Sequence, residues 1–237
     1  MAGTFRTNAG NTEKSECHEG EDFKEKIMKV FLLSLVLSSS FLGYGQRIFS
    51  EGTIIYAVSS TVDDKSMNAD VKSIQQVKGA HTRVELNSAV GRTVTIFNSR
   101  DEEGAILQEF GSQKIMIPVT KENLSLRNKK FENIVYEYTG DAKKILDYNC
   151  LKATSTLIDG TRIEVYFSKD LLTDNTDIGF QFGSLPGLAL EFTSTIGNRS
   201  VKYSAVSIKF EPVPIQNFDI PTSGYRILSY EESQKKK

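Results

Sequence analysis

The sequence has few of the residues that build catalytic and metal sites. Its 237 residues include two cysteines, two histidines, five prolines and no tryptophan. Two cysteines cannot form a disulfide-rich scaffold, and so few cysteines and histidines exclude most zinc modules. Lysine and arginine total 29 against 30 acidic residues, so no basic excess is available to neutralise nucleic-acid phosphates. We therefore expect no nucleic-acid partner.

The remaining composition is that of a globular protein, with 39% hydrophobic and 25% charged residues. Because a domain usually has roughly 100–200 residues, the chain allows one domain or a small pair. A large multidomain assembly is excluded by length alone.

The longest apolar run has the features of an export signal. Residues 30–42 read VFLLSLVLSSSFL, lysines precede them, and the small residues Gly43 and Gly45 follow. This is the arrangement of a secretory signal peptide with cleavage before Gln46. A retained membrane anchor is the alternative, but a spanning helix needs about 20 apolar residues. We expect a protein exported to the periplasm or outer cell envelope, or secreted, that is not an integral membrane protein after signal removal.

The residues before this run are polar and show no periodicity. Because a signal peptide begins with its basic zone, we predict that Met28, followed by Lys29, is the true start. The predicted organisation is therefore a mis-assigned N-terminal extension at residues 1–27, a signal peptide at residues 28–45, and a single β-rich domain at residues 46–237.

Alternation of apolar and polar residues with period two recurs along residues 46–237, as expected of strands with one buried face. The alternation predicts strands around Val84, from Ile134 to Thr139, and around Val165 and Leu190. Further strands are predicted at residues 53–58, 93–98, 105–110, 114–119, 149–157 and 201–210. Asp159-Gly160 predicts a tight hairpin turn, because glycine accepts positive φ, and Thr139-Gly140-Asp141 predicts another turn.

Two segments predict short helices. Between Asp63 and Lys78 the apolar residues Met67, Val71 and Ile74 are spaced by four and three, with acids at the start and Gly79 after the end. That pattern is typical of an amphipathic helix. A second helix is predicted to begin at Thr120. The predicted fold class is mainly β (α+β), a curved antiparallel sheet or open half-barrel with one or two short helices.

No recognised catalytic motif is present in the sequence. It contains no nucleophile elbow, no phosphate-binding glycine loop and no paired cysteines, so we predict no catalytic residue, no metal site and no cofactor. His81 is either a partly exposed strand histidine or part of a site. The acid spacing at residues 174–179 does not fit a calcium loop and indicates a polar loop. Cys150 is either a buried, inert thiol or a partner in an intermolecular disulfide.

Two segments of the chain resemble a known family. Residues 184–192, SLPGLALEF, resemble the motif that names the GLPGLI family of exported proteins, which is abundant in Bacteroidota. Residues 143–153, KKILDYNCLKA, resemble the family's second motif, Lys-x-Ile-Leu-Gly-Tyr-x-Cys-x-Lys-Ala. Ser184, Ala189 and Asp147 depart from the family's pattern, so the chain resembles a divergent member. The family has no established activity, and the resemblance implies no catalytic residue.

The motif residues singled out as a structural corner or the lip of a cavity are Leu185, Pro186, Gly187, Leu188, Tyr148 and Cys150. Pro186 fixes φ and Gly187 accepts a positive φ, which predicts a type II turn that starts the next strand. In the structural alternative this turn places Leu185 and Leu188 in the core. In the other alternative the same residues border a ligand cavity.

Three functions from different classes remain. The first is a non-catalytic protein that binds a lipid or other apolar ligand in the cavity of a curved sheet, as in the periplasmic lipoprotein carriers that the strand-rich pattern resembles. The second is a protein–protein interaction module with a partner in the cell envelope. The third is an enzyme, an uncharacterised hydrolase. The sequence favours the first.

Overall fold

A computed structural model describes residues 1, 3–4, 45–63, 65–173, 175 and 180–235 of the chain. The predicted N-terminal extension and signal peptide therefore lie outside the described residues, apart from residues 1, 3, 4 and 45, and so does almost all of the predicted polar loop at residues 174–179. Gly45–Lys237 forms one compact unit, which is described below.

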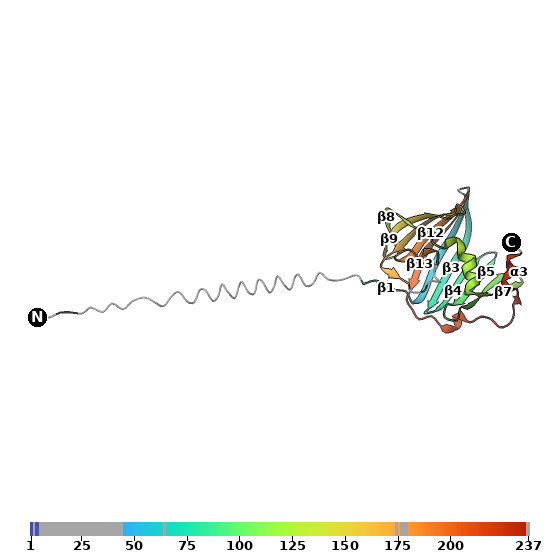
Figure 1. The fold of residues 1–237 in the computed structure, drawn as a ribbon, viewed down its shortest axis with the longest axis horizontal. Helices are drawn as coiled ribbons and strands as arrows, with labels where there is room; N and C mark the ends of the chain where they lie inside the picture. Colours follow the sequence, from blue (N-terminus) through green and yellow to red (C-terminus); the bar gives the residue numbers. More distant parts are fainter. Residues whose placement is uncertain (2, 5–44, 64, 174, 176–179, 236–237) are drawn as a thin grey trace. The chain divides into compact units, whose positions relative to one another are not determined.

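Strands make up most of this unit (Figure 1). The larger sheet contains β2 (Glu51–Val62), β3 (Lys65–Lys78), β4 (His81–Ser88), β5 (Gly91–Asn98), β6 (Glu103–Phe110), β7 (Gln113–Thr120), β8 (Glu137–Ile145), β9 (Tyr148–Thr156), β10 (Arg162–Ser168), β12 (Leu188–Ile196), β13 (Arg199–Lys209) and β14 (Arg226–Ile227). A small parallel pair consists of β1 (Arg47–Ile48) and β11 (Leu171–Leu172). The helical elements are α2 (Lys121–Asn128), α3 (Tyr230–Gln234) and the 3-10 turns η1 (Lys129–Phe131), η2 (Phe180–Phe182) and η3 (Ile215–Phe218).

The larger sheet is open and curved. Its strand order is β14-β7-β6-β5-β4-β3-β2-β13-β12-β10-β9-β8. Neighbours are antiparallel except the short β14, which runs parallel to β7. Within the described residues, the terminal strands β14 and β8 do not pair with each other, so the sheet does not close. The predicted fold class, a curved antiparallel sheet with short helices, is confirmed.

Register places the side chains of the sheet on two faces. In-register pairs join Tyr56 to Ser73, Gln75 to Val84 and Val84 to Thr95, so these residues share one face. We call it the α2 face, because α2 lies across it near the middle of the sheet (Figure 1). The largest hydrophobic cluster gathers around β2, β9, β10 and β12. Its fully buried side chains include Phe49, Ile54, Val165, Phe167 and Leu190.

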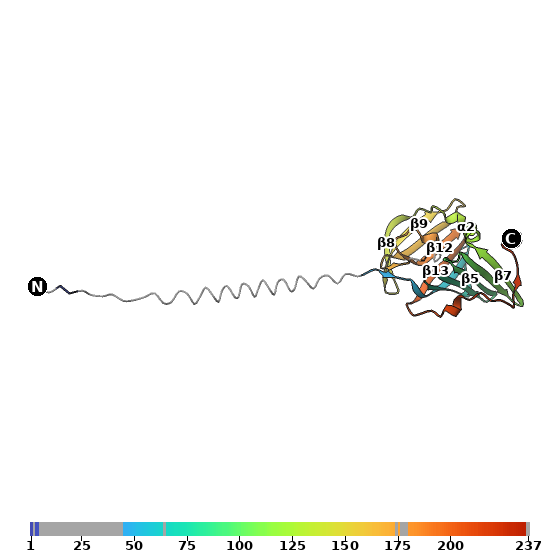
Figure 2. The same ribbon diagram turned by 60° about the horizontal axis from the view of Figure 1, so that its bottom comes forward.

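The C-terminal segment covers the opposite face over β5 and β6 and then passes round the β7 edge (Figure 2). Val213 and Phe218 pack against Val94 and Ile96 on that face. After β14 pairs with β7, Leu228 joins a cluster on the α2 face. The chain thereby buries side chains on both faces of strands β5 and β6.

The helix predicted from Asp63 to Lys78 is wrong, because this segment forms strand β3. β3 pairs with β2 on one side and with β4 on the other, and Ser73 and Val77 are buried. Asp63 and Gly79, which suggested the two ends of a helix, lie in hairpin turns instead. Asp63 has a φ of 50° and its carboxylate accepts a hydrogen bond from Asn198, and Gly79 has a φ of 56° in the β3–β4 turn. Pairing on both edges overrides the local helical spacing.

The strand predicted from Ile134 begins later, at Glu137, and the predicted turn at Thr139-Gly140-Asp141 lies inside β8. The register between β8 and β9 shifts between Tyr138 and Ala142, and Gly140 has a φ of 81°. The glycine therefore marks a bulge in an edge strand rather than a hairpin. Tyr136, just before β8, is buried and packs in the core.

Other predictions agree with the structure. α2 begins at the predicted place: the hydroxyl of Thr120 accepts a hydrogen bond from the backbone of Asn123, and the Asn123 side chain accepts one from the backbone of Thr120. This reciprocal cap satisfies two backbone donors. β9 and β10 form the predicted hairpin, with Gly160 at a φ of 79°.

Candidate ligand-binding pocket

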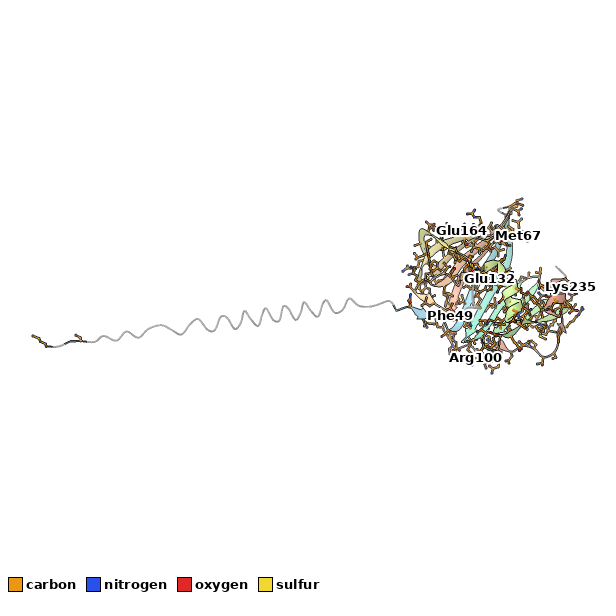
Figure 3. The ribbon with its side chains drawn as sticks, in the orientation of Figure 1. Phe49, Met67, Arg100, Glu132, Glu164 and Lys235 are labelled. Atoms are coloured by element: carbon orange, nitrogen blue, oxygen red, sulfur yellow. The ribbon has the colours of Figure 1, made fainter. Side chains whose placement is uncertain are left out.

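A half-open pocket of about 650 Å³ lies between the helical segment α2–η1 and the α2 face of the sheet. Its floor comes from β4 and β5, and its walls come from α2, η1 and the segment around η2. The lining residues are Thr82, Val84, Thr95, Phe97, Lys121, Leu124, Ser125, Arg127, Asn128, Lys130, Phe131, Glu132, Phe180 and Gly183. Glu132, which follows η1, is labelled near the middle of the unit in Figure 3.

Packing fixes the walls of this pocket. Leu124 packs against the cluster that contains the buried Phe97, which anchors α2 to the sheet. The rings of Phe131 and Phe180 meet edge to face with centroids 5.4 Å apart. The hydroxyl of Thr82 donates to the carbonyl of Phe97 at 3.3 Å, so its one hydrogen-bond donor is already used. The floor therefore presents mainly apolar surface to a ligand.

Charged side chains line the pocket from α2 and the turn after it. Lys121 pairs with Glu102 at 2.5 Å and Lys130 pairs with Asp159 at 3.6 Å. Arg127 is exposed, and within the described residues it makes no ion pair. Glu132 supplies the one acidic side chain of the lining. The arrangement combines an apolar floor with a predominantly basic rim.

The SLPGLALEF segment borders a second, smaller cavity of about 150 Å³. Leu185, Gly187 and Leu188 line it, together with Tyr56 and Phe192. Leu185 and Leu188 are also buried in the main core, whereas Pro186 is exposed. The two alternatives for this motif, a structural corner and the lip of a cavity, therefore apply to the same residues, because Leu185 and Leu188 both pack in the core and border a cavity. Gly183 lines both cavities, so the motif adjoins the larger pocket.

The predicted type II turn at Pro186-Gly187 is wrong in one respect, because φ of Gly187 is not positive. Glycine is required there for a different reason. A Cβ at this position would overlap the backbone carbonyl oxygen of Ser168. The close approach of two backbones, rather than a left-handed conformation, accounts for the glycine.

The second motif lies away from the pocket, in β8 and β9. Tyr148 is half-buried at the start of β9, and Cys150 is fully buried in the main core. Burial raises the pKa of the Cys150 thiol to about 11. An ion pair of 2.6 Å between Lys143 and Glu191 joins the two motif segments across the sheet. Burial opposes ionisation of Glu191, but hydrogen bonds from Lys143 and Lys202 outweigh it and lower its pKa.

His81 lies at the start of β4 and is partly exposed. Its Nε2 is 3.2 Å from the side-chain amide of Asn98, and its ring packs on Phe218 with centroids 5.6 Å apart. These contacts tie the C-terminal segment to the sheet, which agrees with the prediction of a strand histidine. His81 does not line the larger pocket.

Sequence reasoning missed the residues that form the larger pocket. Val84, Phe97, Leu124, Phe131 and Phe180 come from segments far apart in the chain, and none belongs to a motif. The alternation along β4 and β5 predicted which side chains share a face, but not which segment covers it.

Within the described part of the chain, no helix has the length and apolar character needed to cross a membrane.

No protein-family model and no curated protein matches the sequence. Among solved structures, the chain is similar to PNGF-II, with 15% identity and a TM-score of 0.46, over 78% of this chain and 32% of that chain. It is similar to MucB, with 9% identity and a TM-score of 0.40, over 73% of this chain and 58% of that chain. It is also similar to the lipoprotein LppX of Mycobacterium tuberculosis, with 11% identity and a TM-score of 0.32, over 70% and 90% of the two chains. The chain thus spans less than two thirds of PNGF-II and of MucB.

Proposed function

We propose that this chain is an exported, non-catalytic protein of the GLPGLI type that binds a hydrophobic ligand in the pocket beneath α2. The observation that supports this function best is the pocket itself. Its volume of about 650 Å³ lies within the range of about 300–1,000 Å³ that is usual for small-molecule sites.

The composition of the lining supports an apolar ligand. Val84, Phe97, Leu124, Phe131 and Phe180 provide aliphatic and aromatic contact area from four different elements and the segment between β11 and β12. Apolar surface kept partly open to solvent is costly, and covering it with a ligand recovers the hydrophobic free energy. On the floor, the Thr82 hydroxyl already donates a hydrogen bond within the protein.

Filling the pocket tests this function. Thr95 faces the pocket from β5, so Thr95→Trp should occupy part of the volume and weaken binding of a fluorescent apolar probe such as N-phenyl-1-naphthylamine. Leu126→Trp is the matched control, because Leu126 lies on α2, is 63% exposed and does not line the pocket. Circular dichroism melting checks that both variants fold. Equal probe binding by the two variants would contradict a site beneath α2.

A second candidate function uses the edge of the sheet. β8 is the terminal strand, most of its side chains are exposed, and Tyr138 on it is 56% exposed. An exposed edge strand can pair with an extended segment of a partner. A photo-crosslinker at Tyr138 should then capture one dominant envelope protein in intact cells. The same group at Ile158, which is fully exposed in the β9–β10 turn, should not.

A further inference from the structure

We propose that the pocket beneath α2 selects single-chain amphiphiles that carry an anionic headgroup, with the alkyl chain over Val84 and the headgroup at Arg127. This inference rests on the function proposed above and names the class of ligand for the same site.

The distribution of charge around the pocket supports an anionic headgroup. Three cationic side chains line it, those of Lys121, Arg127 and Lys130, against the single carboxylate of Glu132. Glu102 and Asp159, the carboxylates that pair with the two lysines, do not line the pocket. Because those carboxylates offset the two lysines, Arg127 is the cation of the lining that has no carboxylate partner within the described residues, and an anionic headgroup can supply that partner whereas an amine cannot.

Arg127 has the position and chemistry to hold the headgroup. It lies in the last turn of α2, exposed at the pocket, and within the described residues no carboxylate pairs with it. A guanidinium presents a planar fork of N–H donors that binds a carboxylate or phosphate through two parallel hydrogen bonds. The two lysines are each paired with a carboxylate outside the lining, so Arg127 carries the preference for an anion.

The shape of the site supports one alkyl chain rather than two. The volume of about 650 Å³ is near the middle of the range for one small molecule. Beyond the pocket, the apolar surface of the α2 face continues along β4 from Val84 to Leu86, which is 37% exposed. A single chain can follow this strand while its headgroup stays at the basic rim.

Calorimetric titration at low ionic strength tests the inference with amphiphiles of equal chain length, each below its critical micelle concentration. Dodecanoate and dodecyl phosphate carry the anionic headgroups, dodecanol is neutral, and dodecyltrimethylammonium is cationic. We expect both anions to bind about three- to tenfold more tightly than the alcohol, as a solvent-accessible ion pair allows. The cation should bind most weakly, and added salt should reduce the preference for anions.

Charge variants localise the effect. Arg127→Glu should remove the preference for the anions over dodecanol, and Arg127→Gln should reduce that preference. Glu132→Gln should increase the preference. Arg199→Glu makes the same change of charge at an exposed residue that does not line the pocket, and it should have no effect. Because the side chains of Arg127, Glu132 and Arg199 are all exposed, the variants should fold.

Three further outcomes bear on this inference and on the proposed function. Equal affinities for anion and alcohol, unchanged by Arg127→Glu, would overturn the selection for anions and leave an apolar site standing. Failure of every amphiphile to bind would overturn both. Binding of phosphatidic acid vesicles without binding of dodecanoate or dodecyl phosphate would contradict a single-chain ligand.

Discussion

The hydroxyl of Tyr56 donates a 2.9 Å hydrogen bond to the backbone carbonyl of Ala189, 133 residues later in the chain. Tyr56 is buried in β2, and Ala189 belongs to the SLPGLALEF segment at the start of β12. Burial raises the pKa of Tyr56, so the hydroxyl stays protonated and continues to donate. This bond attaches the motif segment to the α2 face of the sheet.

Removing this hydroxyl should destabilise the fold. Tyr56→Phe leaves the Ala189 carbonyl without its partner in a buried position, which costs about 1–3 kcal/mol. Urea unfolding followed by circular dichroism measures the loss. Tyr138→Phe is the control, since Tyr138 is 56% exposed and its hydroxyl makes no hydrogen bond within the described residues. Equal stability losses in the two variants would show that the Tyr56 bond does not support the motif.

A methyl group at Gly187 should be poorly tolerated. Gly187→Ala forces a Cβ into the carbonyl of Ser168, and since this neighbour is backbone, the segments must separate, at a cost of about 1–3 kcal/mol. At Gly183, four residues earlier, the nearest atom to an added Cβ would be the carbonyl oxygen of Phe180 at 3.4 Å. Gly183→Ala should therefore change the melting temperature little. A larger fall in melting temperature for Gly183→Ala than for Gly187→Ala would contradict the close approach at Gly187.

Acid should weaken the fold partly through Glu85. Burial acts to raise the pKa of Glu85, but hydrogen bonds from Arg92, Asn87 and Arg83 outweigh it and lower the pKa to about 2. Because the folded pKa lies below the unfolded one, ionised Glu85 stabilises the fold at neutral pH, and this contribution is lost as pH falls from about 5 towards 2.

Unfolding free energies measured between pH 7 and pH 3 check this contribution. Glu85→Gln should be less stable than the wild type at pH 7 and should lose less stability on acidification. Glu103→Gln, at an exposed carboxylate, should follow the wild-type curve. Parallel curves for wild type and Glu85→Gln would contradict the role of the Glu85 network.

Cys150 should be unreactive in the folded protein. Its side chain is fully buried, and its pKa of about 11 leaves little thiolate at neutral pH. In a Cys17→Ser variant, labelling by a thiol reagent should be slow in buffer and fast in urea. Rapid native labelling would contradict the burial of Cys150, and a disulfide-linked dimer on non-reducing gels would favour the intermolecular disulfide.

The β-rich fold could be predicted because alternation with period two is a local signal. The prediction failed at residues 63–78, where Met67, Val71 and Ile74 show helical spacing. The segment is a strand because it pairs with β2 and β4. At Gly187 the prediction of a positive φ was wrong, because the glycine is required by a close backbone contact instead. That contact, with Ser168 of β10, depends on a neighbour 19 residues away in sequence that local turn rules do not include.

The pocket could not be predicted from local patterns. The half-buried side of β4 and β5 was visible in the alternation around Val84 and at residues 93–98. That α2 lies across these strands depends on Leu124 packing beside Phe97 and on Phe131 meeting Phe180. These are long-range contacts between residues that follow no common motif, so only the folded chain brings them together.

Native mass spectrometry of the protein purified from its native cells tests the central claim most directly. If the pocket beneath α2 holds an apolar ligand, the wild type should carry a small amphiphilic molecule that is lost on collisional activation. The Thr95→Trp variant should carry much less of it, and Leu126→Trp should carry as much as the wild type. A bare polypeptide mass for the wild type in several independent preparations, or equal loading of the Thr95→Trp variant, would contradict the account.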